Sequence, residues 1–148
     1  MSENLERKRL IDEMLQSAKT IAVVGMSNKT ERASFHIGTY LAKHGYRVVP
    51  VNPMLSEVAV NGQVLTSYPT LEDAQAALAV EGVPIDLVDV FRASDAVPGI
   101  VDDVIRLRIP YLWLQDGVQD DVAIARAEAA GVKCIQNDCI FREHAARA

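Results

Sequence analysis

The sequence predicts an α/β protein in which a parallel sheet is doubly wound, with helices packed on both of its faces. Short apolar runs of strand length alternate along the chain with longer segments of helical periodicity. The run from Ile21 to Val24 contains no polar residue, which is typical of a strand buried on both faces. Right-handed crossovers between parallel strands place helices on either side of the sheet, so we expect a three-layer, Rossmann-like architecture.

The elements are expected in a regular order along 148 residues, which we interpret as a single domain, 1–148. Residues 1–18 contain an amphipathic helix, from about 4 to 18, that is expected to pack on the rest of the domain. A first strand at 20–24 leads through a tight loop into a helix that covers 35–41. Further strands are expected at 46–51, 86–91, 111–115 and 132–136, and further helices at 71–80, 95–107, 120–130 and 138–146.

Individual residues mark the ends of several helices. Thr70 is expected to cap the helix that follows it, and Ser94 is expected to do the same for the next one. Gly45 and Gly131 lie just past two helical segments, where glycine commonly terminates a helix. The segment 54–69 has poor periodicity, and we assign only a turn at Asn61-Gly62 and a short strand at 63–66.

Composition and charge disfavour several classes of protein. The net charge of −5 argues against a nucleic-acid partner, and no apolar run approaches the ~20 residues that span a bilayer. Residues 2–9 are polar and charged, unlike a signal peptide. The two cysteines, Cys134 and Cys139, suggest reduced thiols. We therefore expect a soluble, cytoplasmic protein without a membrane or nucleic-acid partner.

The fold also predicts where a ligand binds. Open α/β sheets bind ligands beyond the carboxyl ends of their strands, near the point where strand order reverses. Gly25 follows the first strand and allows a tight turn toward a helix start, whose backbone N–H groups favour an anion such as phosphate. Lys29 and Arg32 either supplement that anion site or remain solvated loop charges. Asn52-Pro53 follows the second strand, as part of a site or as a simple turn.

The later strand ends leave similar alternatives open. Arg92 follows Phe91 and can reach a phosphate or pair with an acidic neighbour. Gln115-Asp116-Gly117 again brings a glycine to a strand end, where it can serve the turn alone. Trp113 alternates with leucines within a strand and is interpreted as a core residue.

No catalytic or metal-binding constellation is recognisable in the sequence. Cys134, Cys139 and His144 do not have the spacing of a compact zinc site. His36 and His44 have no recognisable partner that would activate a nucleophile. Cys139 is expected near a helix start, where it either forms a mixed disulfide with a thiol ligand or stays buried and inert.

Several short motifs, in their order and spacing, resemble the small, single-domain CoA-binding proteins. This family is similar in fold to the CoA-binding domain of the succinyl-CoA synthetase α subunit, and the resemblance covers about Thr20 to His144. The motifs that carry it are Gly25-x-Ser27, Arg32-Ala33-Ser34, Gly45-Tyr46-Arg47-Val48-Val49-Pro50-Val51-Asn52-Pro53, Tyr68-Pro69, Asp89-Val90-Phe91-Arg92, Trp113-Leu114-Gln115-x-Gly117, and Cys139 with Glu143-His144.

The resemblance implies that coenzyme A, or an acyl-CoA, binds in the crevice at the strand ends. By this resemblance the phosphate side is formed by Gly25, Ser27, Asn28, Arg32 and Ser34. The adenosine lies by Val51, Asn52 and Pro53, the other wall is formed by Val90, Phe91 and Arg92, and Gln115 and Gly117 match a later glycine loop.

Two departures from the family pattern and one missing domain limit what the resemblance implies. Ala33 stands where the family often has proline, and Asn137-Asp138 stands where many relatives have Asp-Arg. The synthetase's phosphorylated histidine belongs to a second domain that this chain lacks. We therefore expect binding without catalysis, with an unidentified enzyme that uses acyl-CoA as a possible partner.

An NAD(P)-dependent oxidoreductase of the Rossmann type is the alternative. The dinucleotide fingerprint requires two further glycines, and this loop has Ser27 and Thr30 at the matching positions. An NAD site also usually has an acidic residue after the second strand, where this chain has Asn52. A structural or interaction module with an empty crevice is a third interpretation.

Overall fold

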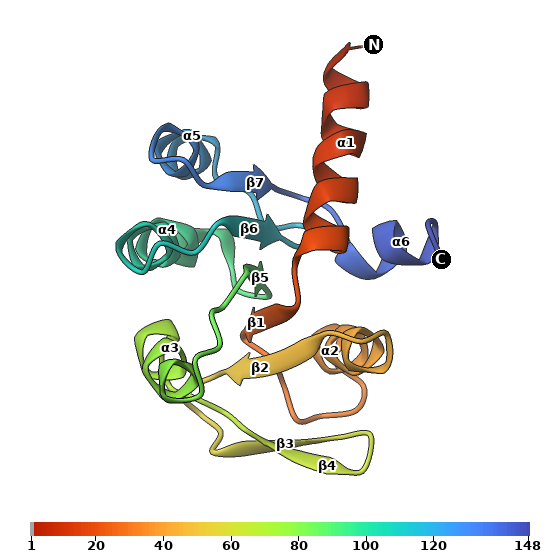
Figure 1. Cartoon of the computed structure of the whole chain (residues 1–148), viewed down its shortest axis with the longest axis vertical. Coiled ribbons are helices and arrows are strands. Elements are labelled where there is room, and N and C mark those ends of the chain that lie inside the picture. Colours follow the sequence, from red (N-terminus) through yellow and green to blue (C-terminus); the bar gives the residue numbers. More distant parts are fainter. Residues whose placement is uncertain (1) are drawn as a thin grey trace.

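Strand and helix alternate as predicted and form a parallel sheet between two helical layers (Figure 1). The computed structural model describes residues 2–148. The five strands of the sheet have the order β2-β1-β5-β6-β7. In chain order they are β1 (Thr20–Val24), β2 (Arg47–Val51), β5 (Leu87–Val90), β6 (Tyr111–Leu114) and β7 (Lys133–Ile135). The predicted fold class is confirmed, and the strand order reverses between β1 and β5.

Each face of the sheet carries its own apolar core. One face packs against α3 (Leu71–Val80), α4 (Val97–Arg106) and α5 (Asp121–Ala129), and the other against α1 (Ser2–Ser17), α2 (Ala33–Lys43) and α6 (Ile140–Ala145). Figure 1 shows these two groups of helices on opposite sides of the sheet. Trp113 is fully buried in the second core, as its position in the strand predicts, and its indole N–H donates to the carbonyl of Asp138.

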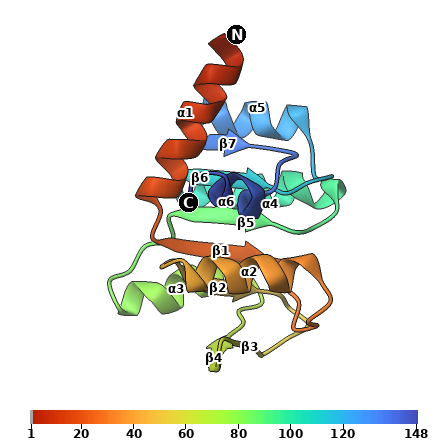
Figure 2. The same cartoon turned by 90° about the vertical axis from the view of Figure 1, so that its right-hand side faces the viewer.

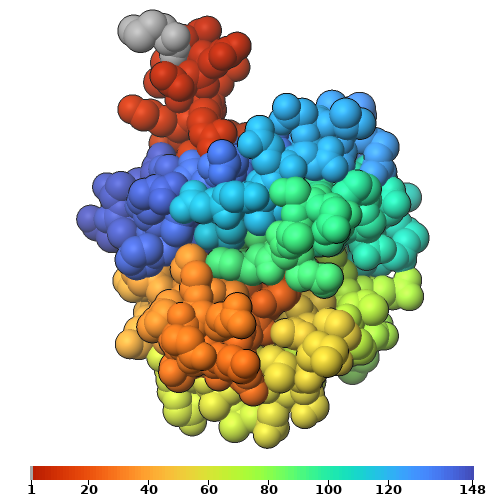
Figure 3. Space-filling view, turned by 180° about the vertical axis from the view of Figure 1, so that it is seen from behind, coloured from red at the N-terminus to blue at the C-terminus, as the bar shows by residue number. Residues whose placement is uncertain are grey.

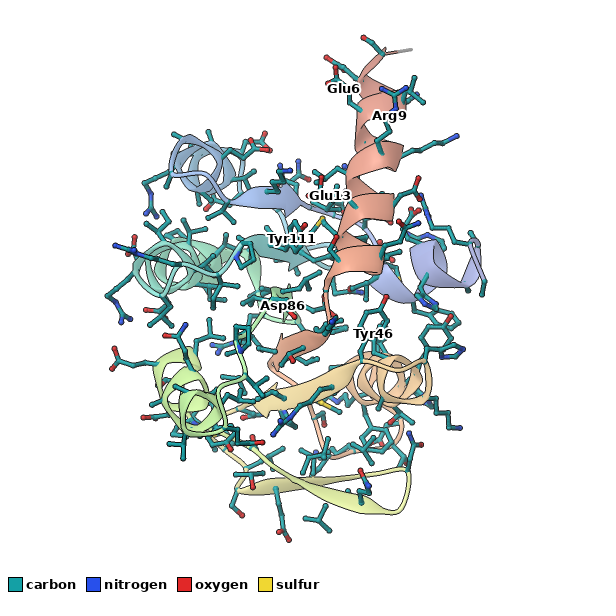
Figure 4. The ribbon with its side chains drawn as sticks, viewed as in Figure 1. Glu6, Arg9, Glu13, Tyr46, Asp86 and Tyr111 are labelled. Carbon is teal, nitrogen blue, oxygen red and sulfur yellow. The ribbon has the colours of Figure 1, made fainter. Side chains whose placement is uncertain are left out.

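The buried contacts of α1 come from its second half, and Arg7 in its first half pairs with Asp138. Ile11, Met14 and Leu15 are buried, and Glu13 accepts a hydrogen bond from the Tyr111 hydroxyl and pairs with Lys133 (Figure 4). The first turns of the helix are exposed and project beyond the rest of the molecule (Figure 2). No helix within residues 2–148 is both long enough and apolar enough to cross a membrane.

The segment 54–69 contains a strand that the sequence pattern did not predict. β3 (Glu57–Val60) pairs antiparallel with β4 (Gln63–Thr66), and the predicted turn joins them with positive φ at Asn61 and Gly62. Val58 and Val60 are buried against the sheet, whereas their neighbours in β3 are exposed. Two apolar positions are too few to give a clear alternation, so β3 was missed while β4 was predicted.

One predicted helix cap is confirmed and the other is wrong. The Thr70 hydroxyl accepts a hydrogen bond from the amide of Asp73, 3.1 Å away, at the start of α3. Ser94 instead lies inside a short 3-10 turn, η1 (Ser94–Ala96), that precedes α4. Its hydroxyl accepts from the amide of Gln119 at 2.9 Å, so the side chain links two loops at the carboxyl end of the sheet.

Candidate functional site

The residue that follows β1, Gly25, lies directly against the backbone of Phe91, which follows β5, at the point where the strand order reverses. Gly25 has φ +86°, and a Cβ on this residue would lie 2.4 Å from the carbonyl oxygen of Phe91. Its amide donates to the carbonyl of Val51 at 2.8 Å, so three neighbouring strands meet at this residue. Both the positive φ and the close approach require glycine here, because any side chain would collide with backbone.

The loop after β1 is held in shape by two serines. The Ser27 hydroxyl accepts from the amide of Lys29 at 3.0 Å, and the Ser34 hydroxyl accepts from the amide of Ser27 at 2.9 Å. In both contacts the hydroxyl acts as acceptor, so its own hydrogen is free to be donated to a ligand. The two serines therefore shape the loop and also offer donors along it.

The N-terminus of α2 faces the same loop with unused donors. Within the described chain, the amides of Ala33 and Ser34 have no hydrogen-bond acceptor, and the N-cap residue Arg32 forms no side-chain cap. The first turn of α2 contains no acidic residue, and Lys29 lies next to it. Free amides, the positive end of the helix dipole and two cations together make this loop a favourable place for an anion.

Asn52 connects the loops that follow β1 and β2. Its side-chain amide donates to the carbonyl of Met26 at 3.0 Å, and its side-chain oxygen accepts from the amide of Met54 at 2.9 Å. The resemblance to CoA-binding proteins placed Asn52 beside the adenosine of a ligand. In the structure its oxygen and one of its hydrogens already have partners within the protein, so its clearest role is to fix the geometry of the two loops.

These loops enclose a cavity of about 530 Å³ at the carboxyl end of the sheet. Figure 3 looks onto this end, where the orange loop after β1 borders the yellow loop after β2. The cavity is lined by Gly25, Ser27, Asn28, Lys29, Arg32, Ala33, Ser34, Asn52, Met54, Leu55 and Phe91. It thus combines cations and backbone donors on one side with apolar side chains on the other.

The structure brings together only some of the predicted site residues. Those that line the cavity are Gly25, Ser27, Asn28, Arg32, Ser34, Asn52 and Phe91. Val51 and Val90 lie at the predicted strand ends, but their side chains are buried in the core. Pro53 and Arg92 are exposed beside the cavity without lining it.

Gln115 and Gly117 support other parts of the structure. The side-chain oxygen of Gln115 accepts from the amide of Ile140, and the amide of Gly117 donates to the side chain of Asn137. Both follow β6, bond to residues that follow β7, and do not line the cavity. Their observed hydrogen bonds hold together the loops at this end of the sheet. Contact of Gln115 and Gly117 with a ligand stays a prediction.

Met54 and Leu55 line the cavity but were not predicted. Met54 is 84% exposed, which is unusual for so large an apolar side chain. The sequence does contain a signal for them. They are two apolar residues that directly follow Asn52-Pro53, in a loop without the periodicity of a helix or strand.

Asp89 is a buried acid beneath the cavity. It lies two residues before Phe91 on β5, beside Val23 and Trp113 in the neighbouring strands. Its side chain is fully buried, and neither carboxyl oxygen has a hydrogen-bond partner among residues 2–148. Burial raises the pKa of the Asp89 carboxyl well above its ordinary value, which favours the protonated, neutral form.

The cysteines do not contribute to the cavity. Cys139 is buried at the start of α6 and packs in the core, and burial raises the pKa of the Cys134 thiol to about 12. Neither lines the cavity. In the part of the chain that the structure describes, no three His, Cys, Asp or Glu residues are placed to hold a metal ion together.

Comparison with known proteins identifies related chains of the same size. A family model described as a CoA binding domain matches residues 19–145. The uncharacterized protein YneT of Bacillus subtilis is 32% identical over 138 residues, which cover 93% of this chain and 94% of YneT.

Solved structures agree with this match. A hypothetical protein from Pyrococcus horikoshii is similar at 33% identity and a TM-score of 0.80, covering 94% of this chain and 90% of that one. A protein from Thermus thermophilus is similar at 29% identity and a TM-score of 0.82, covering 94% and 97%.

Proposed function

Because this chain belongs to the family of CoA binding domains, we propose that it binds coenzyme A or an acyl-CoA at the carboxyl ends of β1 and β5. The observation that carries the proposal is the open start of α2, where the free amides of Ala33 and Ser34 lie beside Lys29 and Arg32. CoA carries phosphate groups, and a protein with a net charge of −5 needs such a local positive site to hold them.

The apolar side of the cavity suits the rest of the ligand. Met54, Leu55 and Phe91 offer surfaces for a base or for an uncharged chain, opposite the donors of α2. A volume of about 530 Å³ lies in the range of small-molecule sites, roughly 300–1,000 Å³.

We further propose that the protein binds its ligand without catalysing a reaction. The lining of the cavity, taken from the described residues, contains no carboxylate, histidine or cysteine that would serve as a base or as an activated nucleophile. A carrier that presents CoA or acyl-CoA to a separate enzyme is consistent with this lining.

The residues at the site disfavour the nicotinamide alternative. Ser27 and Thr30 replace the further glycines of the dinucleotide fingerprint. Asn52 replaces the acid that usually binds the ribose hydroxyls, and its side chain is bonded within the protein.

The proposal is tested by titration calorimetry with CoA, acetyl-CoA, dephospho-CoA and NADH. We expect CoA to bind more tightly than NADH, and dephospho-CoA to bind more weakly than CoA. Arg32→Ala should weaken CoA binding by about 1–3 kcal/mol, because it removes a charge-assisted hydrogen bond to phosphate. Lys8→Ala, which removes a positive charge from the exposed part of α1, is the matched control and should leave the affinity unchanged.

Two results would contradict the proposal. Tighter binding of NADH than of CoA would favour the oxidoreductase interpretation. Steady hydrolysis of acetyl-CoA that disappears in Cys139→Ser would show that the protein is an enzyme.

A further inference from the structure

A second cavity lies along the outer edge of the sheet, between β2 and the β3–β4 hairpin. β2 is the last strand on this side of the sheet, and the hairpin runs beside it (Figure 1). A parallel bridge joins Val51 of β2 to Tyr68, two residues beyond the end of β4. Behind this bridge the two strands enclose about 470 Å³, and the described residues that line this space all differ from those of the first cavity.

The cavity side of β2 has backbone groups that the sheet does not use. The amide of Arg47 donates to the carbonyl of Lys19 at 2.8 Å, on the β1 side. Successive residues of a strand direct their backbone groups to opposite sides, so Val48 directs its N–H and C=O toward the cavity. Pro50, two residues further on, accepts from the amide of Tyr68 at 3.0 Å on that same side. The N–H and C=O of Val48 have no hydrogen-bond partner among residues 2–148.

β4 faces β2 across the cavity with groups of the same kind. The amide of Ser67 donates to the carbonyl of Ser56 at 2.9 Å, on the β3 side, whereas the amide and carbonyl of Tyr68 bond on the β2 side. By the same alternation, Thr66 and Val64 direct their N–H and C=O toward β2. In the described part of the chain these groups also lack a partner. Two unpaired strand edges therefore face each other.

The walls between the two edges are apolar. Ala42 of α2 and Leu78 of α3 line the cavity from the two helical layers, and Val60 lines it from the hairpin. Within the described lining, Arg47 is the one charged residue, and its guanidinium already donates to both carboxylate oxygens of Glu81, at 2.9 and 3.0 Å. A further charge brought into this space would therefore be desolvated without a partner.

We propose that this cavity binds an extended, uncharged segment of another protein, which adds a strand between β2 and β4. Unpaired donors and acceptors on both sides fit an occupant with such groups on both of its own edges, as an extended peptide has. The free groups at Val48 and from Val64 to Thr66 limit the paired segment to about four residues. The segment comes from a different protein, because the strands within residues 2–148 are all paired already.

The test is an NMR titration with the uncharged peptide acetyl-Thr-Val-Thr-Val-Thr-amide, whose residues favour strands. We expect saturable shifts of the amide signals of Val48, Val64 and Thr66. Hydrogen exchange at these amides should be fast in the free protein and should slow by tenfold or more at saturating peptide. The matched control peptide has N-methyl groups on both valines, which remove the N–H groups of one edge and keep the side chains. It should bind at least tenfold more weakly.

Two substitutions test whether the edge of β4 forms these bonds. Val64→Pro removes an N–H that points into the cavity, at an edge position where a strand tolerates proline. It should weaken binding of the peptide tenfold or more. Ala59→Pro removes an N–H on the opposite edge of the hairpin and is the matched control, for which we expect unchanged binding. The thermal midpoints check that both variants fold.

Three results would overturn the proposal. Slow exchange of the Val48 and Val64 amides in the free protein would mean that both edges are already paired. Absence of saturable shifts at these residues would mean that the cavity holds water only. Equal binding of the methylated and unmethylated peptides would mean that the peptide does not pair as a strand.

Discussion

Asp89 should make the stability of this protein fall as pH rises. The folded protein holds its buried carboxyl in the protonated form, because burial raises its pKa and neither oxygen has a hydrogen-bond partner in the described part of the chain. The unfolded chain loses this proton near the ordinary pKa of an aspartate, about 3.9. Between the unfolded and the folded pKa, the folded state therefore binds one proton more than the unfolded state.

The magnitude follows from this proton difference. A difference of one proton lowers the free energy of unfolding by about 1.4 kcal/mol for each pH unit above the unfolded pKa, until the folded pKa is reached. Asp89→Asn keeps the shape of the side chain but removes the proton. The variant should therefore lack this contribution to the pH dependence.

The assay is urea denaturation at pH 5, 5.5 and 6 for the unaltered protein and the variant. Subtracting the two free energies of unfolding cancels the contributions of all other titrating groups, because both proteins contain the same groups. The difference should change by about 1.4 kcal/mol per pH unit while the folded pKa remains higher than the pH. Asp95→Asn removes an exposed carboxylate and is the matched control, for which we expect no such difference. Equal slopes for the Asp89 variant and the unaltered protein would refute the reasoning.

Two further substitutions test the backbone and the loops around the cavity. Gly25→Ala should lower the free energy of unfolding by about 1–3 kcal/mol or more. The reason is that residue 25 has a left-handed backbone conformation, in which a Cβ would collide with the Phe91 carbonyl. If urea denatures the variant and the unaltered protein at the same concentration, residue 25 does not lie so close to Phe91. Asn52→Asp removes the hydrogen bond to the Met26 carbonyl and places a negative charge beside that carbonyl. Both the stability of the unliganded protein and its affinity for CoA should therefore fall. A loss of affinity at an unchanged thermal midpoint would instead mean that residue 52 contacts the ligand directly.

Some elements of the site were predictable because their causes are local. Gly25 is marked by an apolar strand that ends in glycine before a helical segment, and the Thr70 cap needs only the helix that follows it. Arg32 and Ser34 follow the same strand closely, as the N-cap and a first-turn residue of α2. Features of this kind depend on residues that are close in sequence, so one stretch of chain contains the whole signal.

Other elements depend on partners far away in the chain. Asn52 was interpreted as a ligand contact, but its amide bonds to Met26, 26 residues earlier. Val51 and Val90 were placed at the site because their strands end there, and only the packed structure shows that their side chains point into the core. β3 was missed because burial against the sheet, not its own alternation, stabilises it.

The sequence by itself determined the fold class, the end of the sheet at which the candidate cavity lies, and the glycine that follows β1 at that end. The fold class follows from hydrophobic periodicity, and the role of the glycine follows from its conformational freedom. Both properties can be recognised within a few neighbouring residues. Only the tertiary structure decided that no residue among 2–148 pairs with Asp89 and that His144 reaches Tyr40 across 104 residues. The pairing and burial of polar groups are set by which elements pack together, and such long-range contacts have no signature in the local pattern of a single sequence.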